Sequence, residues 1–158
     1  MDAAVEVRRA IGAELAQVQR RIGEAWGDPI VVRGRNYPVG ALDLCLIAGD
    51  FDGVLAFEVD EKPVCELVAI IAQTPWRGAG TALIAALRRE LGDGFTQIRL
   101  MTTNDNVDAL RFYQRRGFRL TALRPGAVDD SRRHKPGIPL TGDYDIPIRD
   151  ELDLTLDL

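Results

Sequence analysis

The 158-residue sequence predicts an α/β (α+β) fold, in which helices flank a mixed central sheet of six to seven strands. Three observations support this class: three amphipathic helix patterns, seven apolar or alternating runs bounded by turn residues, and the lack of any internal repeat. A chain of this length buries roughly 70% of its unfolded surface, which suffices for one good core but not comfortably for two. We therefore expect a single domain over residues 1–158.

The three helix patterns each end at a recognisable stop. The first is predicted over residues 4–25, where apolar residues recur at three- and four-residue spacing until Gly27-Asp28-Pro29. The second is predicted over residues 78–91 and stops at the glycine that follows. The third covers residues 106–116 and ends at Gly117, the residue type that most often forms a left-handed C-cap.

Strands are predicted wherever apolar or β-branched runs are separated by turn residues. The clearest turns, at residues 50–53 and 60–63, divide a meander in the first half of the chain. Residues 125–147 contain four prolines and three glycines and are expected to lack regular structure. The predicted strands cover residues 29–33, 41–48, 54–59, 64–72, 96–101, 118–123 and 148–158.

Composition limits the chemistry that this chain can perform. Because 20 Lys and Arg oppose 24 Asp and Glu, the net charge of −4 gives no general attraction for nucleic acid or anionic membrane. The single histidine, His134, and two cysteines, expected in the core as Cys45 and Cys65, do not supply the usual zinc ligands. No apolar run approaches the ~20 residues of a membrane span, and no secretory pattern is visible. We expect a cytoplasmic protein without metal, nucleic-acid or membrane partners.

The most informative motif is a buried strand that runs through a short turn into the glycine-rich helix start Arg77-Gly-Ala-Gly-Thr-Ala82. The first turn of a helix leaves backbone N–H groups without partners, and glycines let a ligand approach them closely. The pattern predicts an anion site suited to pyrophosphate, and a tight turn without a ligand remains the alternative. Triphosphate and dinucleotide loops do not fit, because Gly-Lys-Ser/Thr is lacking and Leu83 replaces a third glycine.

Two spaced motifs resemble one known family. Arg77-x-x-Gly80-x-Ala82 is similar to the acetyl-CoA signature Q/R-x-x-G-x-G/A of the GNAT superfamily of N-acetyltransferases. Asn106-x-x-Ala109-x-x-x-Tyr113-x-x-x-Gly117-Phe118 resembles the superfamily's other signature. The resemblance extends from about residue 41 to the C-terminus, and the tail looks like a bacterial subgroup without an assigned substrate. It implies the GNAT fold, with a V-shaped splay between the fourth and fifth strands.

The resemblance also implies a mechanism, in which an amine attacks the thioester of the co-substrate acetyl-CoA directly. Ile70, Ile71 and Ala72 would pair with the pantetheine arm through their backbone, and Asn106 would hydrogen-bond the same arm. A backbone N–H near Ile71 would polarise the thioester carbonyl, and Tyr113 would protonate the departing thiolate. The pyrophosphate would be held by the backbone N–H groups of Arg77, Gly78, Ala79, Gly80, Thr81 and Ala82.

A general base is needed as well, because the attacking amine must lose a proton. Glu66 is the candidate, since it is a carboxylate in an otherwise apolar strand directly before the turn. The alternative is that Glu66 lies on the exposed face of the strand; Asp43 and Glu58 are then the reserve candidates. If the basic loop at residues 132–135 faced the site, a carboxylate-bearing acceptor would be expected.

The expected acceptor is a small-molecule amine or a protein amino group. The alternative is a non-catalytic acyl-CoA-binding or regulatory module on the same fold. A nucleic-acid-binding domain using the arginines of residues 111–116 is disfavoured by the net acidity. A homodimer is possible, because the regular last strand could pair with a partner's edge.

Overall fold

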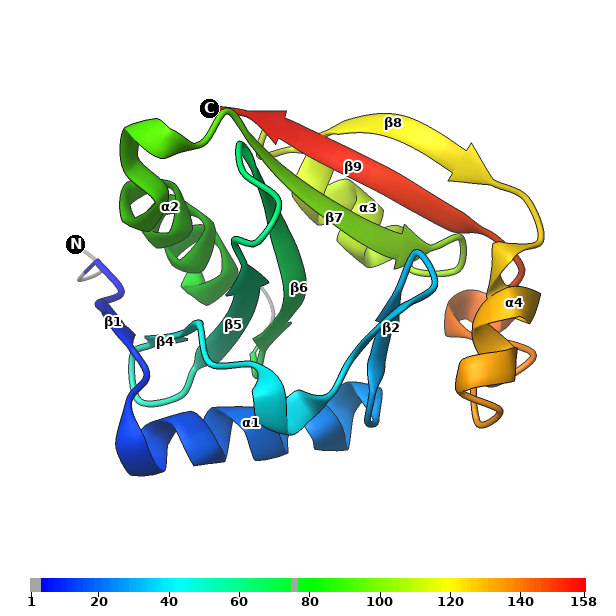
Figure 1. Cartoon of the computed structure of the whole chain (residues 1–158), viewed down its shortest axis with the longest axis horizontal. Helices are drawn as coiled ribbons and strands as arrows, with labels where there is room; N and C mark the ends of the chain where they lie inside the picture. Colours follow the sequence, from blue (N-terminus) through cyan, green and yellow to red (C-terminus); the bar gives the residue numbers. More distant parts are fainter. Residues whose placement is uncertain (1–3, 75–76) are drawn as a thin grey trace.

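A seven-stranded sheet forms the centre of the computed structural model, which describes residues 4–74 and 77–158 (Figure 1). The strands are β1 (Val7–Arg9), β4 (Cys45–Ala48), β5 (Gly53–Glu58), β6 (Val64–Ala72), β7 (Gln97–Thr103), β8 (Arg119–Arg124) and β9 (Glu151–Asp157). Their spatial order is β1-β4-β5-β6-β7-β9-β8, and β6 and β7 form the parallel pair in an otherwise antiparallel sheet. The predicted mixed sheet of six to seven strands is confirmed.

The parallel pair of β6 and β7 opens partway along its length. Residues 64–66 pair with residues 97–99, and β6 then continues to Ala72 with β5 as its partner. β7 instead diverges from β6 and stays paired with β9 over residues 97–103. Because β6 and β7 are the fourth and fifth sheet strands along the chain, the predicted V-shaped splay is confirmed.

Helices cover both faces of the sheet (Figure 1). α2 (Ala79–Leu91) and α3 (Val107–Gln114) pack on one face. α1 (Gly12–Trp26) packs on the other, together with a separate hairpin of β2 (Ile30–Val32) and β3 (Arg35–Tyr37). The α2 and α3 face buries Leu83, Leu87 and Tyr113 against Leu55, Cys65 and Ile98, and the α1 face buries Val18 and Ile22 against Cys45, Ile47 and Val54. The predicted core positions of the two cysteines are thereby confirmed.

The N-terminal helix begins later than predicted. Residues 4–11 are not helical, and Val7 lies in β1, the edge strand that pairs with β4. Although Val7 and Ile11 have helical spacing, Val7 packs against the α2 side of the sheet and Ile11 is 71% exposed. The N–H of Ala10 donates to the Cys45 carbonyl at 2.9 Å. Sheet pairing at this edge therefore outweighs the local helical pattern.

The sequence analysis did not predict the β2–β3 hairpin, although it placed a strand over residues 29–33. The two strands are joined at Arg33 and Gly34, whose φ angles of +49° and +76° are those of a two-residue hairpin turn. Gly34 was the residue in the sequence that could have indicated this turn, because glycine adopts a positive φ readily. The hairpin turn directs the Arg33 side chain toward the sheet, where it bonds carboxylates on β6 and β9.

The expectation that residues 125–147 lack regular structure is wrong, because α4 (Ala127–His134) forms there. The four prolines of residues 125–147 all lie outside α4, and Gly126, with a φ of +73°, is the N-cap of this helix. The charge pattern was the missed signal, since acids at a helix start and bases at its end complement the helix dipole. Those residues are Asp129 and Asp130 in the first turn and Arg132, Arg133 and His134 in the last.

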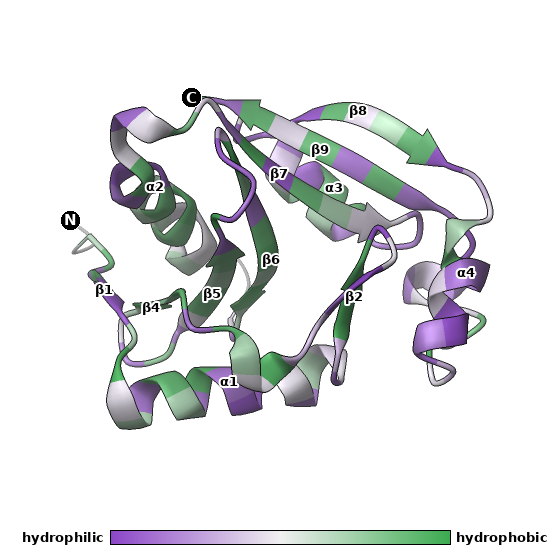
Figure 2. Ribbon diagram, in the orientation of Figure 1, coloured by the Kyte–Doolittle hydropathy of each residue, from purple (hydrophilic) through white to green (hydrophobic). Residues whose placement is uncertain are grey.

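The last strand, β9, lies inside the sheet. It pairs with β7 on one side and with β8 on the other, so the proposed basis for a homodimer, pairing along this strand, is wrong. Figure 2 shows the predicted alternation of apolar and polar residues along β9. Within the described residues, no helix combines the length and apolarity that crossing a bilayer requires.

Candidate active site

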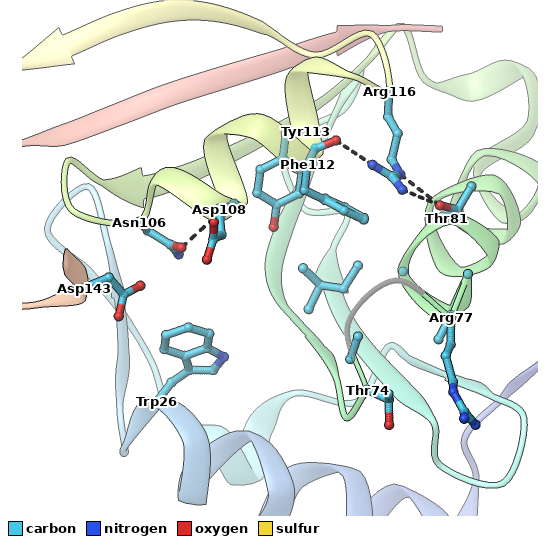
Figure 3. Close-up of a pocket in the computed structure, with 16 residues that line it drawn as sticks. Trp26, Thr74, Arg77, Thr81, Asn106, Asp108, Phe112, Tyr113, Arg116 and Asp143 are labelled. Atoms are coloured by element: carbon cyan, nitrogen blue, oxygen red, sulfur yellow. Dashed lines mark hydrogen bonds between the residues drawn. The ribbon is translucent and has the colours of Figure 1, made fainter.

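A cavity of about 450 Å³ lies where β6 and β7 diverge, beside the start of α2 and one side of α3 (Figure 3). Nine of the twelve residues with predicted roles line it, and the exceptions are Ile71, Ala82 and Glu66. The lining residues are Trp26, Ile70, Ala72, Thr74, Arg77, Gly78, Ala79, Gly80, Thr81, Asn106, Asp108, Ala109, Phe112, Tyr113, Arg116 and Asp143. The two motifs, which are about 25 residues apart in the sequence, therefore meet at one place, as the family resemblance implies.

One end of the cavity is the N-terminus of α2. Gly78 caps this helix with a φ of +83°, and a Cβ there would meet no atom within 4 Å. The N–H groups of Ala79, Gly80 and Thr81 belong to the first turn and have no acceptor inside the helix. The Ala82 N–H, by contrast, donates to the Gly78 carbonyl at 2.9 Å. The open first turn can bind an anion, and Ala82 contributes to the helix instead.

Gly80 has a second reason to be glycine besides ligand approach. A Cβ at this position would lie 2.8 Å and 2.9 Å from Cζ and Cε2 of Phe112 on α3. The guanidinium of Arg116 stacks 3.6 Å from the centre of the Phe112 ring and donates to Thr81 Oγ1 at 2.6 and 3.0 Å. A side chain at Gly80 would therefore require Phe112 to shift, and the ring is held by the same packing that fixes a cation at this end of the cavity.

The backbone of β6 presents groups to the cavity in alternation. The N–H of Gln73 donates at 2.9 Å to the carbonyl of Asp52, the residue immediately before β5. Because successive residues of a strand direct their backbone groups to opposite sides, Ile71 also faces β5, and Ile70 and Ala72 face the opened gap. Ile70 and Ala72 line the cavity, in keeping with this assignment.

Asn106 and Tyr113 enter the cavity from α3. Asn106 is the N-cap of the helix, and its Oδ1 accepts from the Ala109 N–H at 3.3 Å. The cap uses the carbonyl oxygen, so the amide group can still donate to a ligand. Tyr113 is buried, and its ring makes edge-on contacts with Phe112 and Phe118. Burial raises the pKa of Tyr113 far above its usual value, so the phenol is protonated at neutral pH.

Glu66 lies outside the large cavity, in a network of ion pairs. It is 5% exposed, so the alternative that it lies on an exposed face is wrong. Its Oε2 accepts from Arg33 and, at 2.9 Å, from Nε of Arg99, and Arg33 also bonds Asp153 at 2.9 Å. Burial raises the pKa of Glu66, and the two guanidinium groups oppose that effect. Its Oε1 is buried without a hydrogen-bond partner among the described residues.

The reserve base candidates and the basic loop also lie away from the large cavity. Glu58 shares a small cavity with Glu66 and Tyr37, and Asp43 is exposed. Arg132 donates to the backbone carbonyls of three residues that follow α4, which holds that segment together. None of residues 132–135 lines the large cavity. The ground for expecting a carboxylate-bearing acceptor is therefore lost.

The sequence analysis missed several residues that line the cavity. Trp26 has the helical spacing of a core residue but is 49% exposed at the end of α1. Asp108 lies in a variable position of the second motif, and Asp143 lies in the segment expected to be irregular. Only the folded chain brings these three residues together. Among the described residues, no group of His, Cys, Asp and Glu is arranged to hold a metal ion.

Comparison with known proteins identifies the family. Residues 14–118 match the acetyltransferase (GNAT) family. The chain is 38% identical over 137 residues to a protein of Bacillus subtilis (strain 168) described as uncharacterized protein YxbD, in an alignment that covers 84% of this chain and 86% of the relative. The chain therefore belongs to the acetyltransferase (GNAT) family, and it is an acetyl-CoA-dependent acetyltransferase.

Solved structures share the fold. A GNAT family acetyltransferase from Elizabethkingia anophelis with acetyl-CoA bound matches with a TM-score of 0.71 and 14% identity, over 99% of this chain and 100% of that one. A Bacillus subtilis acetyltransferase in complex with CoA matches with a TM-score of 0.69 and 21% identity, over 98% and 99% of the two chains. The predicted GNAT fold is confirmed.

Proposed function

We propose that this protein is an N-acetyltransferase that moves the acetyl group of acetyl-CoA to a primary amine by direct attack. One observation carries the proposal: a single cavity joins an open helix N-terminus, the gap-facing backbone of a splayed strand and the Tyr113 side chain. These are the groups that a thioester with a pyrophosphate tail requires. The chemistry needs neither a metal ion nor a reactive cysteine, in keeping with Cys45 and Cys65, whose pKa burial raises to about 12.

The co-substrate would lie along the cavity from α2 to Tyr113. The first-turn N–H groups of α2 would bind the pyrophosphate, and Arg77 and Arg116 line the same end and add positive charge. The backbone of Ile70 and Ala72 would pair with the pantetheine arm, and the amide of Asn106 would donate to it. The Ile70 N–H, which alternation directs into the gap, would polarise the thioester carbonyl.

The transfer step forms one bond and breaks one. The amine nitrogen bonds to the carbonyl carbon, the carbon–sulfur bond breaks, and the electron pair leaves with sulfur as a thiolate. Tyr113 gives its proton to that thiolate. The amine loses a proton, which we assign to Glu66 by way of water, since Glu66 does not line the cavity itself.

The Tyr113→Phe variant tests the acid. Thiol release with a panel of amines should slow by about 100-fold, the usual contribution of a general acid. Acetyl-CoA affinity, measured by calorimetry, should change little, because the ring and its packing remain. Undiminished turnover would remove Tyr113 from this role. If the wild-type protein bound acetyl-CoA tightly but turned over no amine, the non-catalytic acyl-CoA-binding module would be favoured.

The Glu66→Gln variant tests the base through the pH profile. A carboxylate base is active when ionised, so the wild-type rate should rise with pH through the pKa of Glu66 and then level off. The amide variant should be slower and should lack this rise. A pH profile with the wild-type shape would exclude Glu66 as the base. Thermal unfolding of the variant serves as the control, because the neutral amide lacks the charge that binds Arg33 and Arg99.

A further inference from the structure

Charge is segregated along the cavity. Arg77 and Arg116 lie at the α2 end, and Asp108 and Asp143 lie at the opposite end, with Tyr113 between them (Figure 3). The α2 end fits the pyrophosphate of acetyl-CoA, and the thioester would reach Tyr113. The end with the two carboxylates is therefore where the acceptor must enter.

The carboxylate end is held in place by specific contacts. It is formed by α3 and by the turn η3 (Asp143–Asp145). The buried Asp105 accepts from the Asp143 N–H at 3.1 Å and from the Thr103 hydroxyl at 2.5 Å. The Tyr144 hydroxyl, on the same turn, donates to both carboxylate oxygens of Asp108 at 2.9 Å. Two links thus fasten η3 to the start of α3, so the two carboxylates share one side of the cavity.

An aromatic wall completes this end. The indole of Trp26, half-exposed at the end of α1, lines the cavity together with the two carboxylates (Figure 3). An indole face beside carboxylates suits an organic cation, which gains from both. Two cations lie nearby. The Lys135 ammonium donates a hydrogen bond to the Trp26 carbonyl. Asp108 raises the pKa of Tyr144, and Arg111 lies close enough to Tyr144 to oppose that effect in part. Neither cation is among the residues that line the cavity.

We infer that this end binds a second, non-reacting ammonium group, so that the preferred acceptors are diamines or polyamines. The inference rests on the proposed function, because it takes the cavity as the acetyl-transfer site. A carboxylate beside the reacting amine would hold that amine protonated and would oppose its attack. The same carboxylates beside a remote ammonium bind the acceptor without that cost, and the remote binding orients the free amine toward the thioester.

The test compares amines of matched length. CoA-loaded protein is titrated calorimetrically with 1,4-diaminobutane and with butylamine, and acetylation of both is followed by thiol release from acetyl-CoA. The diamine should bind at least about 10-fold more tightly and show a correspondingly higher kcat/KM, as expected for one charge-assisted contact. Asp143→Asn should reduce this preference toward unity and should leave the KM for acetyl-CoA unchanged. Asp93→Asn, an exposed acid at the far end of α2, is the matched control and should preserve the preference.

The outcomes separate this inference from the proposed function. Equal acetylation and equal binding of the two amines would overturn the inference and leave the N-acetyltransferase proposal standing. Binding of the diamine that depends on Asp143, without acetylation of any amine, would support the cation site and count against the proposed catalysis. A diamine preference that survives Asp143→Asn and Asp108→Asn would overturn the assignment of the site to these carboxylates.

Discussion

Substituting Gly80 by alanine tests the packing of α2 against α3, which carries the Tyr113 side chain. The new Cβ would lie 2.8 Å from Phe112 Cζ, whereas carbon atoms at optimal contact are about 3.5–4.0 Å apart. The ring cannot move away freely, because Arg116 stacks on it and Tyr113 touches its edge, with centroids 5.3 Å apart. Such overpacking costs about 1–3 kcal/mol, and each kcal/mol lowers the melting temperature by about 2–4 °C in a chain of this size.

A double-mutant cycle gives the decisive assay. Calorimetric unfolding is measured for the wild type, Gly80→Ala, Phe112→Leu and the double variant. Leucine lacks the ring atoms that meet the new Cβ, so Gly80→Ala should be neutral in the F112L background, or stabilising by up to about 1 kcal/mol through its helix propensity. Equal destabilisation in both backgrounds, or stabilisation of the wild type by Gly80→Ala, would refute the reasoning. The Gly80→Ala variant should lose activity as well as stability, because displacing the Phe112 ring disturbs its edge-on contact with Tyr113.

Three further predictions concern the helix cap and the ion-pair network. Gly78→Ala should cost about 1–2 kcal/mol in calorimetric unfolding from its φ of +83° alone, since the added Cβ has open space, and Gly78→Asn should cost less. Arg33→Met should cost about 2–3 kcal/mol in urea unfolding, less than the usual 3–5 for a broken buried pair, because Glu66 and Asp153 each keep another guanidinium. Burial raises the pKa of Asp153, but hydrogen bonds from Arg124 and Arg33 outweigh it and lower the pKa. Ionised Asp153 therefore stabilises the folded state fully above its unfolded pKa of about 3.9, and this stabilisation is lost as pH falls through the lower folded pKa. Because Arg124→Met removes one of the groups that lower this pKa, the variant should lose less free energy of unfolding than the wild type over that acid range. A parallel loss would contradict the pairing.

The cavity was largely predictable from the sequence, because its parts are local. A helix start with free N–H groups, an N-capping asparagine and a glycine in the turn after a helix are each encoded within a few residues. Asn106 takes the N-cap position that its residue type favours, and Gly117 adopts a left-handed φ of +94° two residues beyond the C-cap Arg115. The resemblance of both motifs to the GNAT signatures then implied that Gly80 and Tyr113 share one site, and both residues line the cavity.

Two predictions failed because non-local pairing overrode a local pattern. Val7 has the spacing of a helix but gains more from strand pairing with β4. The alternation of the final strand, β9, suits an edge strand, yet β8 pairs with its outer side, so β9 lies inside the sheet. In both cases the competing interaction comes from residues far away along the chain, which no local window contains.

The sequence by itself determined the fold class and the glycine-rich helix start with its open N–H groups, because each depends on backbone preferences expressed over short spans. The tyrosine in the same cavity was predicted from the resemblance of its motif to the GNAT signature. Only the tertiary structure decided where the carboxylates lie. It enclosed Glu66 between Arg33 and Arg99 and brought Asp108 and Asp143 to the cavity beside Trp26. The physical reason is that a charge acquires its role from its surroundings. Burial and partners from distant segments set its protonation and its access to ligand, and those segments meet only in the folded chain.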